Sequence, residues 1–143
     1  LDLLYRNQCL ELIADRVKAG TPYLGWSAGS NIAGLSIKTT NDMPIIQPPS
    51  FAALGLIPCQ INPHYSDFKP AGFHGETRDM RLAEFMQVEP QTPVLALPEG
   101  SAIRQHQQQL YYVGNSDGYL FMGGAKVAIL PGADLTAFLG DAS

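Results

Sequence analysis

The residues best suited to chemistry are a serine and its small neighbours, in the segment Gly25-Trp26-Ser27-Ala28-Gly29. A G-x-S-x-G pattern is typical of a sharp turn between a strand and a helix, which exposes the serine hydroxyl as a nucleophile. The neighbours must be small because the turn would otherwise not close. The N–H groups of Ala28 and Gly29 would then face an oxyanion at the start of the helix. The alternative is a glycine-rich turn that only reverses the chain.

A serine nucleophile needs a base, and the chain has three histidines. His64 follows a short apolar run and is preceded by Pro63, which stiffens the backbone. Because sites in α/β proteins lie at the carboxyl ends of strands, His64 is expected beside Ser27. His74 lies in a loop with glycines on either side, and His106 falls in an alternating, hairpin-like segment typical of solvated strand residues. The sequence therefore favours His64 as the general base.

Two carboxylates are candidates for orienting this histidine. Glu99 ends an apolar strand-like run, whereas Asp42 lies in a polar stretch after the expected elbow helix. The order Ser27, His64, Glu99 differs from the serine–acid–histidine order of α/β-hydrolases. That order would be restored only if Glu99 paired with His106, which a hairpin position makes a poor choice. Asp42 and Glu99 both remain open at this point.

Arg78 is the remaining informative charge. It lies in the first turn of an expected helix, where a cation opposes the helix dipole. Glu76, Asp79 or an anionic ligand would compensate for this unfavourable position. A solvated surface arginine is the alternative interpretation.

The elements that position these residues follow from hydrophobic periodicity and turn residues. Helices are expected at 3–18, at 28–35 and from 75 onward, with Leu82, Phe85 and Met86 on one face of the last. Strands are expected over residues 21–26, 57–61, 93–97, 101–107, 109–114, 119–122 and 126–130. Residues 38–58 are expected to form a loop.

Alternating helices and buried strands predict a mainly parallel sheet with helices on both faces. The chain of 143 residues is short for two such layers, and it opens at Leu1 within a helical pattern and without Met. We therefore expect residues 1–143 to form the carboxyl-terminal portion of a single domain. If the polypeptide started at Leu1, an uncovered sheet edge and apolar face would lower its activity and solubility.

Composition excludes several classes of protein. Thirteen acidic and nine basic residues give a net charge of −4, without the basic clusters that nucleic acid requires. No apolar run is long enough to span a membrane and no signal peptide is recognisable, so a cytoplasmic location is expected. Cys9 and Cys59 are too few for a disulfide framework. The spacing of His64, Asp67 and His74 matches no usual metal site, and no cofactor is expected.

Five sequence blocks together resemble the aspartyl dipeptidase family of serine peptidases, known as the peptidase E family. They occur in the family's order within residues 1–130, and each alone is a weak match. The blocks are Tyr23-Leu24-Gly25-Trp26-Ser27-Ala28-Gly29, Thr39-Thr40-Asn41-Asp42-Met43-Pro44, Gln60-Ile61-Asn62-Pro63-His64, Gly75-Glu76-Thr77-Arg78 and Leu97-Pro98-Glu99-Gly100.

The resemblance implies a flavodoxin-like, three-layer α/β/α sandwich similar to class I glutamine amidotransferases, with serine in place of their cysteine. It implies hydrolysis of dipeptides with an amino-terminal aspartate, with Ser27 as nucleophile and His64 as base. Arg78 matches the residue that receives the substrate's aspartate side chain, which a planar guanidinium binds well. Asp42 or Glu76 would bind the substrate's free amine.

Two other functions stay open. One is a cyanophycinase-like hydrolase of β-aspartyl peptides, which shares the serine elbow. The other is a binding or assembly module whose elbow lacks a complete site. A small peptide is the expected partner in the enzymatic cases, with no nucleic acid or membrane, and the sequence leaves the oligomeric state open, a homodimer included.

Overall fold

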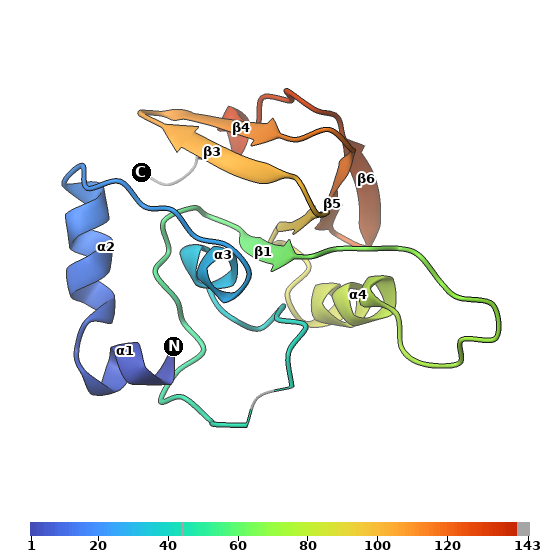
Figure 1. The fold of residues 1–143 in the computed structure, drawn as a ribbon, viewed down its shortest axis with the longest axis horizontal. Coiled ribbons are helices and arrows are strands. Elements are labelled where there is room, and N and C mark those ends of the chain that lie inside the picture. The colour runs from blue at the N-terminus through green and yellow to red at the C-terminus, as the bar shows by residue number, and fades with distance from the viewer. Residues whose placement is uncertain (44, 140–143) are drawn as a thin grey trace.

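The computed structural model describes residues 1–43 and 45–139, in which helices and a separate hairpin pack around a small sheet (Figure 1). The helices are α1 (Asp2–Arg6), α2 (Leu10–Lys18), α3 (Ala28–Ala33), α4 (Arg78–Val88) and the 3-10 helix η1 (Thr136–Leu139). The strands are β1 (Gln60–Pro63), β2 (Val94–Leu97), β3 (Ala102–His106), β4 (Gln109–Val113), β5 (Gly118–Met122) and β6 (Ala125–Ile129). Within the described residues, no helix is long and apolar enough to cross a membrane.

The main sheet has the strand order β1-β2-β5-β6. Strands β1 and β2 are parallel, with Ile61 opposite Leu95, and α4 connects them as a crossover helix. Strands β5 and β6 add to β2 as antiparallel neighbours, and β3 pairs with β4 in a hairpin of its own. The α/β class is therefore confirmed, whereas the described sheet is mixed rather than mainly parallel.

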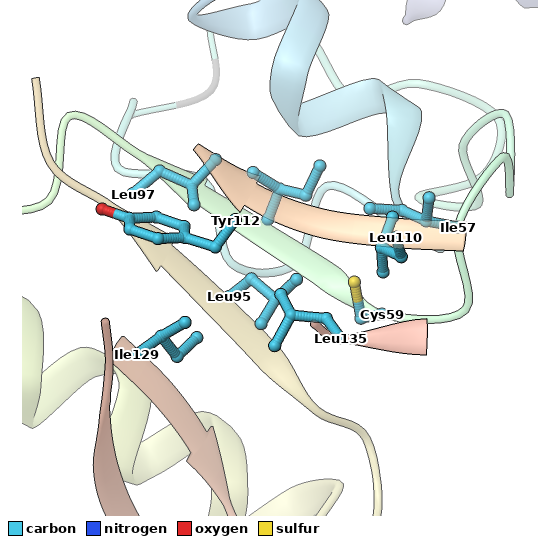
Figure 2. Close-up of a cluster of buried hydrophobic side chains, with 9 residues drawn as sticks. Ile57, Cys59, Leu95, Leu97, Leu110, Tyr112, Ile129 and Leu135 are labelled. Atoms are coloured by element: carbon cyan, nitrogen blue, oxygen red, sulfur yellow. The ribbon is translucent and has the colours of Figure 1, made fainter. Parts of the chain in front are cut away.

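The two faces of the sheet are covered by different layers. Side chains alternate along β2, so Val94 and Ala96 face one layer while Leu95 and Leu97 face the other, and all four are buried. The first face packs against α4 through Tyr65, Leu82, Met86 and Phe121. The second packs against the β3–β4 hairpin and the segment before η1, as Figure 2 shows for Leu110, Tyr112, Ile129 and Leu135.

The second face is covered by the hairpin as well as by a helix, because Ala33 of α3 packs against the same cluster. An apolar strand such as β2 indicates that both faces are covered, but it does not specify whether a helix or a hairpin covers them. Here the alternating segment after Glu99 folds back over the sheet as β3 and β4. Strand β4 shows the expected alternation of exposed and buried residues, because one of its sides faces the sheet.

The single helix expected over residues 3–18 is wrong in one respect, because it is divided into α1 and α2 at residues 7–9. The Asn7 side chain donates a hydrogen bond to the carbonyl of Leu3 (2.8 Å), which competes with continued helix. Gln8 then adopts a left-handed backbone with φ of 54°. The turn lets both helices pack around Leu10, Ala14 and Leu54.

The strand expected over residues 21–26 does not form. These residues make no ladder with the sheet, and Leu24 and Trp26 are 87% and 76% exposed. The outer edge of β1 is already occupied: the carbonyl of Cys59 accepts from the Leu35 N–H (3.0 Å) and that of Ile61 from the Asn31 side chain (2.7 Å). Apolar composition predicted burial here, but a strand also needs a partner with free hydrogen-bonding groups.

Candidate active site

Ser27 has the strained backbone that is typical of the serine in a strand-to-helix elbow. It is the residue before α3, with φ of 51° and ψ of −119°. Left-handed backbone is unfavourable for a residue other than glycine, and it occurs most often at functional sites. The hydroxyl does not cap α3 and makes no hydrogen bond within the described residues. The side chain of Ser27 therefore plays no part in capping the helix.

Close contacts require a glycine at position 25, whereas a Cβ atom on Gly29 would have the Tyr23 hydroxyl at 3.8 Å as its nearest neighbour. A Cβ atom on Gly25 would lie 2.5 Å from the carbonyl oxygen of Gly29, a distance that real Cβ atoms do not reach. The Tyr23 hydroxyl donates to the same oxygen (2.6 Å), and the Ser30 hydroxyl donates to the carbonyl of Gly25 (3.0 Å). These bonds fix the turn on both sides of Ser27, although residues 21–26 lack a strand partner.

His64 is held opposite Glu99 by the parallel pairing of β1 and β2. The register places Pro63 opposite Leu97, and the Tyr65 N–H continues it by donating to the Leu97 carbonyl (2.9 Å). The residues that follow the two strands therefore lie side by side. His64 has φ of 55°, and its Nδ1 contacts the Glu99 carboxylate directly. This contact leaves Nε2 as the nitrogen for proton transfer.

The structure brings Glu99, and not Asp42, to His64. Asp42 is exposed, and its backbone N–H donates to the Thr40 hydroxyl (3.3 Å). The alternative pairing of Glu99 with His106 is absent within the described residues, where Glu99 pairs with His64. His106 is exposed at the end of β3, as expected of a solvated strand residue.

Ser27, His64 and Glu99 line one cavity of about 930 Å³. Its walls come from residues 21–27, from the ends of β1 and β2, and from β3. No hydrogen bond joins Ser27 to His64 in the described residues, so the two groups share a cavity without direct contact. Catalytic hydrogen bonds are commonly long or missing in unliganded sites and tighten when substrate binds.

The candidate oxyanion donors differ from each other in their bonding. The Gly29 N–H donates to the carbonyl of Trp26 (2.9 Å) and is already used within the turn. The Ala28 N–H has no backbone acceptor among the described residues. Of the two N–H groups predicted from the sequence, Ala28 is therefore the one that is free to meet an oxyanion.

Arg78 lies at the same edge of the sheet as His64. Its Nη1 donates to the carbonyl of Pro63 (3.0 Å), and none of the described carboxylates forms an ion pair with it. Burial and then the nearby Arg81 guanidinium lower the pKa of Arg78, while Asp42 and Glu99 act in the opposite direction. A half-buried guanidinium without a carboxylate partner is suited to binding an anionic group.

The two predicted acidic partners of the substrate amine are in different situations. Glu76 forms an ion pair with Arg81, with 3.0 Å between Oε2 and Nε. Asp42 has no ion pair among the described residues. Of these two carboxylates, Asp42 is therefore the one left for a cationic ligand.

A network of amide side chains that we did not predict holds the loop of Asp42 against β1. The Asn62 amide donates to the Thr39 carbonyl and to Asn41 Oδ1, both at 2.8 Å. The Asn41 amide in turn donates to the Pro63 carbonyl (3.0 Å). The sequence contained little sign of this network, because Asn62 follows the expected strand of residues 57–61, whereas in the structure it lies within β1 and is almost fully buried. A buried amide needs hydrogen-bond partners, and here they are loop residues.

The remaining histidine and the candidate metal ligands do not converge. His74 lies in the exposed loop before α4, and Asp67 pairs with Lys126 across 3.5 Å. Over residues 1–43 and 45–139, no three histidine, cysteine or acidic side chains are grouped as metal ligands would be.

Comparisons with known proteins agree in pointing to one family. The sequence model of peptidase family S51 matches residues 1–113. A peptidase E of Shewanella denitrificans is 54% identical over 140 residues, which cover 97% of this chain and 60% of that protein. A peptidase E of Shewanella amazonensis is 56% identical over 137 residues, covering 95% of this chain and 58% of that protein. The chain thus spans about three fifths of the length of these relatives.

Proposed function

The chain belongs to peptidase family S51, and from this premise we propose that it carries the catalytic residues of a serine-type dipeptidase. The substrates are dipeptides with an amino-terminal aspartate. The observation that carries the proposal is the contact between His64 and Glu99 at the cavity that Ser27 lines from its strained turn. A serine, a histidine and a carboxylate on one cavity are the components of nucleophilic acyl transfer.

The mechanism follows from the roles of these three groups. His64 takes the proton of the Ser27 hydroxyl through Nε2 while Glu99 holds Nδ1 and stabilises the imidazolium. The Ser27 oxygen attacks the carbonyl carbon of the substrate's aspartate, and the Ala28 N–H donates to the oxyanion. His64 then protonates the departing amine, which leaves an acyl-enzyme. Water activated by His64 attacks the ester and releases free aspartate.

Specificity for aspartate is assigned to Arg78. The β-carboxylate of the substrate binds the Arg78 guanidinium, which forms no ion pair with a carboxylate among the described residues. Asp42 is assigned to the substrate's free amine, because Glu76 is paired with Arg81. This placement would put the scissile carbonyl between Arg78 and Ser27 and restrict hydrolysis to the first peptide bond.

For the fold, we propose a flavodoxin-like α/β/α sandwich similar to class I glutamine amidotransferases. It is supported by the parallel β1–α4–β2 unit and by the strained serine before α3. An experimental structure of the full-length polypeptide would test this architecture. Helices on only one face of the complete sheet would contradict it.

The proposal is tested by measuring hydrolysis of Asp-Leu by the full-length protein and by its Ser27→Ala variant. We expect Ser27→Ala to lower kcat by a factor of about 10⁴ or more, because no covalent intermediate can form. Ser116→Ala, at an exposed serine, serves as the matched control and should keep wild-type activity. Activity that survives in Ser27→Ala would refute the serine mechanism.

The same assay distinguishes the substrate classes. Asp-Leu, its β-linked isomer and Leu-Leu are compared at equal concentrations with the wild-type protein. Hydrolysis of Asp-Leu alone supports the proposed specificity. Hydrolysis of the β-linked isomer alone would instead indicate a β-aspartyl hydrolase, and no hydrolysis of any of the three would contradict the enzymatic function.

A further inference from the structure

A cluster outside the proposed catalytic residues joins three elements of the fold. The Tyr65 hydroxyl donates a hydrogen bond to Asp79 Oδ1, and Lys126 Nζ lies 3.0 Å from Asp79 Oδ2. The Lys126 ammonium also lies 4.3 Å from the ring centroid of Tyr119 and 5.2 Å from that of Tyr65. The three residues come from the segment after β1, from the first turn of α4 and from β6. Lys126 lies outside the residues matched by the family model.

Two members of this cluster are the immediate neighbours of proposed site residues. Tyr65 follows His64, and Asp79 follows Arg78. Along the chain these pairs are separated by residues 66–77, which contain neither helix nor strand. Such a loop does not hold its two ends at a fixed separation by itself. The bond from Tyr65 to Asp79 makes this connection directly.

The cluster is built to hold its geometry. Tyr65 is 3% exposed, so its hydroxyl depends on the Asp79 carboxylate as a partner. Burial and then the bond to Asp79 raise the pKa of Tyr65 above its ordinary value, which keeps the hydroxyl protonated as a donor. Lys126 neutralises Asp79 and contacts the aromatic rings, so the carboxylate is fixed from two sides.

We propose that Tyr65, Asp79 and Lys126 form a positioning network that sets the separation between the His64 imidazole and the Arg78 guanidinium. This role rests on the proposed function, in which the two groups act on the carbonyl and the β-carboxylate of one substrate. The contact of Arg78 with the Pro63 carbonyl fixes the guanidinium at one end. The network fixes the two backbones behind that contact, so it determines how well an acidic substrate fits.

The test is a double-mutant cycle in the full-length protein. Lys126→Met keeps most of the side-chain length but removes the charge, and Tyr65→Phe keeps the ring but removes the hydroxyl. Each is measured alone and combined with Arg78→Ala, using Asp-Leu and the uncharged analogue Asn-Leu as substrates. Lys69→Met, at an exposed lysine, is the matched control. Urea unfolding of every variant shows how much of any effect reflects lost stability.

If the network positions Arg78, each single variant raises KM for Asp-Leu about tenfold, with a smaller change in kcat. Neither variant then lowers activity on Asp-Leu further once Arg78 is replaced, and Lys126→Arg restores part of the loss. Equal losses with and without Arg78 would overturn the inference and leave a purely stabilising contact. Wild-type protein inactive on Asp-Leu would contradict the proposed function instead, which separates the two failures.

Discussion

At the scale of single residues, the two proposed reacting groups share an unusual backbone. Ser27 and His64 have φ of 51° and 55°, and only two other described residues that are not glycine have positive φ. Both lie where an element begins or ends, Ser27 before α3 and His64 after β1. The backbone therefore directs both side chains, and the motif around Ser27 made its conformation predictable. Nothing in the sequence around His64 predicted a left-handed residue there.

A prediction at the residue scale distinguishes the two carboxylates that the sequence left open, Asp42 and Glu99. We expect Glu99→Gln to lower kcat on Asp-Leu by about 10²- to 10⁴-fold, because an amide no longer stabilises the His64 imidazolium. Asp42→Asn should act mainly on KM, since Asp42 is assigned to the substrate amine. Steady-state kinetics at several pH values measure both effects. A larger kcat loss in Asp42→Asn than in Glu99→Gln would reverse the assignment.

At the scale of elements, the hydrophobic pattern predicted the segments that are fully apolar or that pair with a neighbour in sequence. Helix α4, strand β2 and the β3–β4 hairpin form close to their predicted residues. The segment of residues 21–26 failed because its pattern reports apolar character and not the presence of a free strand edge. The division between α1 and α2 depends on Asn7, a single polar side chain that the periodicity of a longer window obscures.

The sequence was enough to predict which residues belong to the candidate site, but not the hydrogen bonds that hold them in place. The serine, histidine, glutamate and arginine follow from motifs, because each lies at the end of a recognisable element. The amide contacts of Asn41 and Asn62, and the network of Tyr65, Asp79 and Lys126, join residues that are far apart in sequence. Such contacts depend on strand order and register, which a single sequence does not specify.

The elbow makes a prediction at the scale of an element. Gly25→Ala places a Cβ atom against the backbone of Gly29, so we expect the free energy of unfolding to fall by about 1–3 kcal/mol. Activity on Asp-Leu should fall more than tenfold, because Ser27 shifts with the turn. Gly29→Ala is the control for stability, since its Cβ would find no atom closer than 3.8 Å. Urea unfolding compares the two, and equal stabilities would contradict the packing argument.

At the scale of the whole molecule, one sheet joins the hydrophobic core to the site. The hairpin begins at Ala102, shortly after Glu99, and packs over the face that contains Leu95 and Leu97 (Figure 2). The other face packs on α4, which begins with Arg78. The hairpin and α4 therefore start at or close to two proposed site residues. The same connections between elements therefore both pack the core and place the proposed site residues.

The core predicts a measurable difference between two leucines. Leu95 is fully buried between the sheet and the hairpin, so Leu95→Ala should reduce the free energy of unfolding by about 2–5 kcal/mol. Leu130→Ala, at a leucine that is 62% exposed, should reduce it by less than about 1 kcal/mol. Chemical denaturation of both variants measures the difference. Similar losses would show that the hairpin does not enclose this face in solution.

The left-handed backbones at positions 27 and 64 imply a trade-off between thermal stability and the proposed catalytic activity. A residue other than glycine in such a conformation costs folding about 1–3 kcal/mol, and glycine would relieve that cost while deleting the reacting side chain. Laboratory evolution under heat alone would accordingly drift toward glycine at both positions. Selection for growth on a peptide as sole nitrogen source would oppose that drift. Variants that are both active and more thermostable would therefore need stabilising substitutions at other positions.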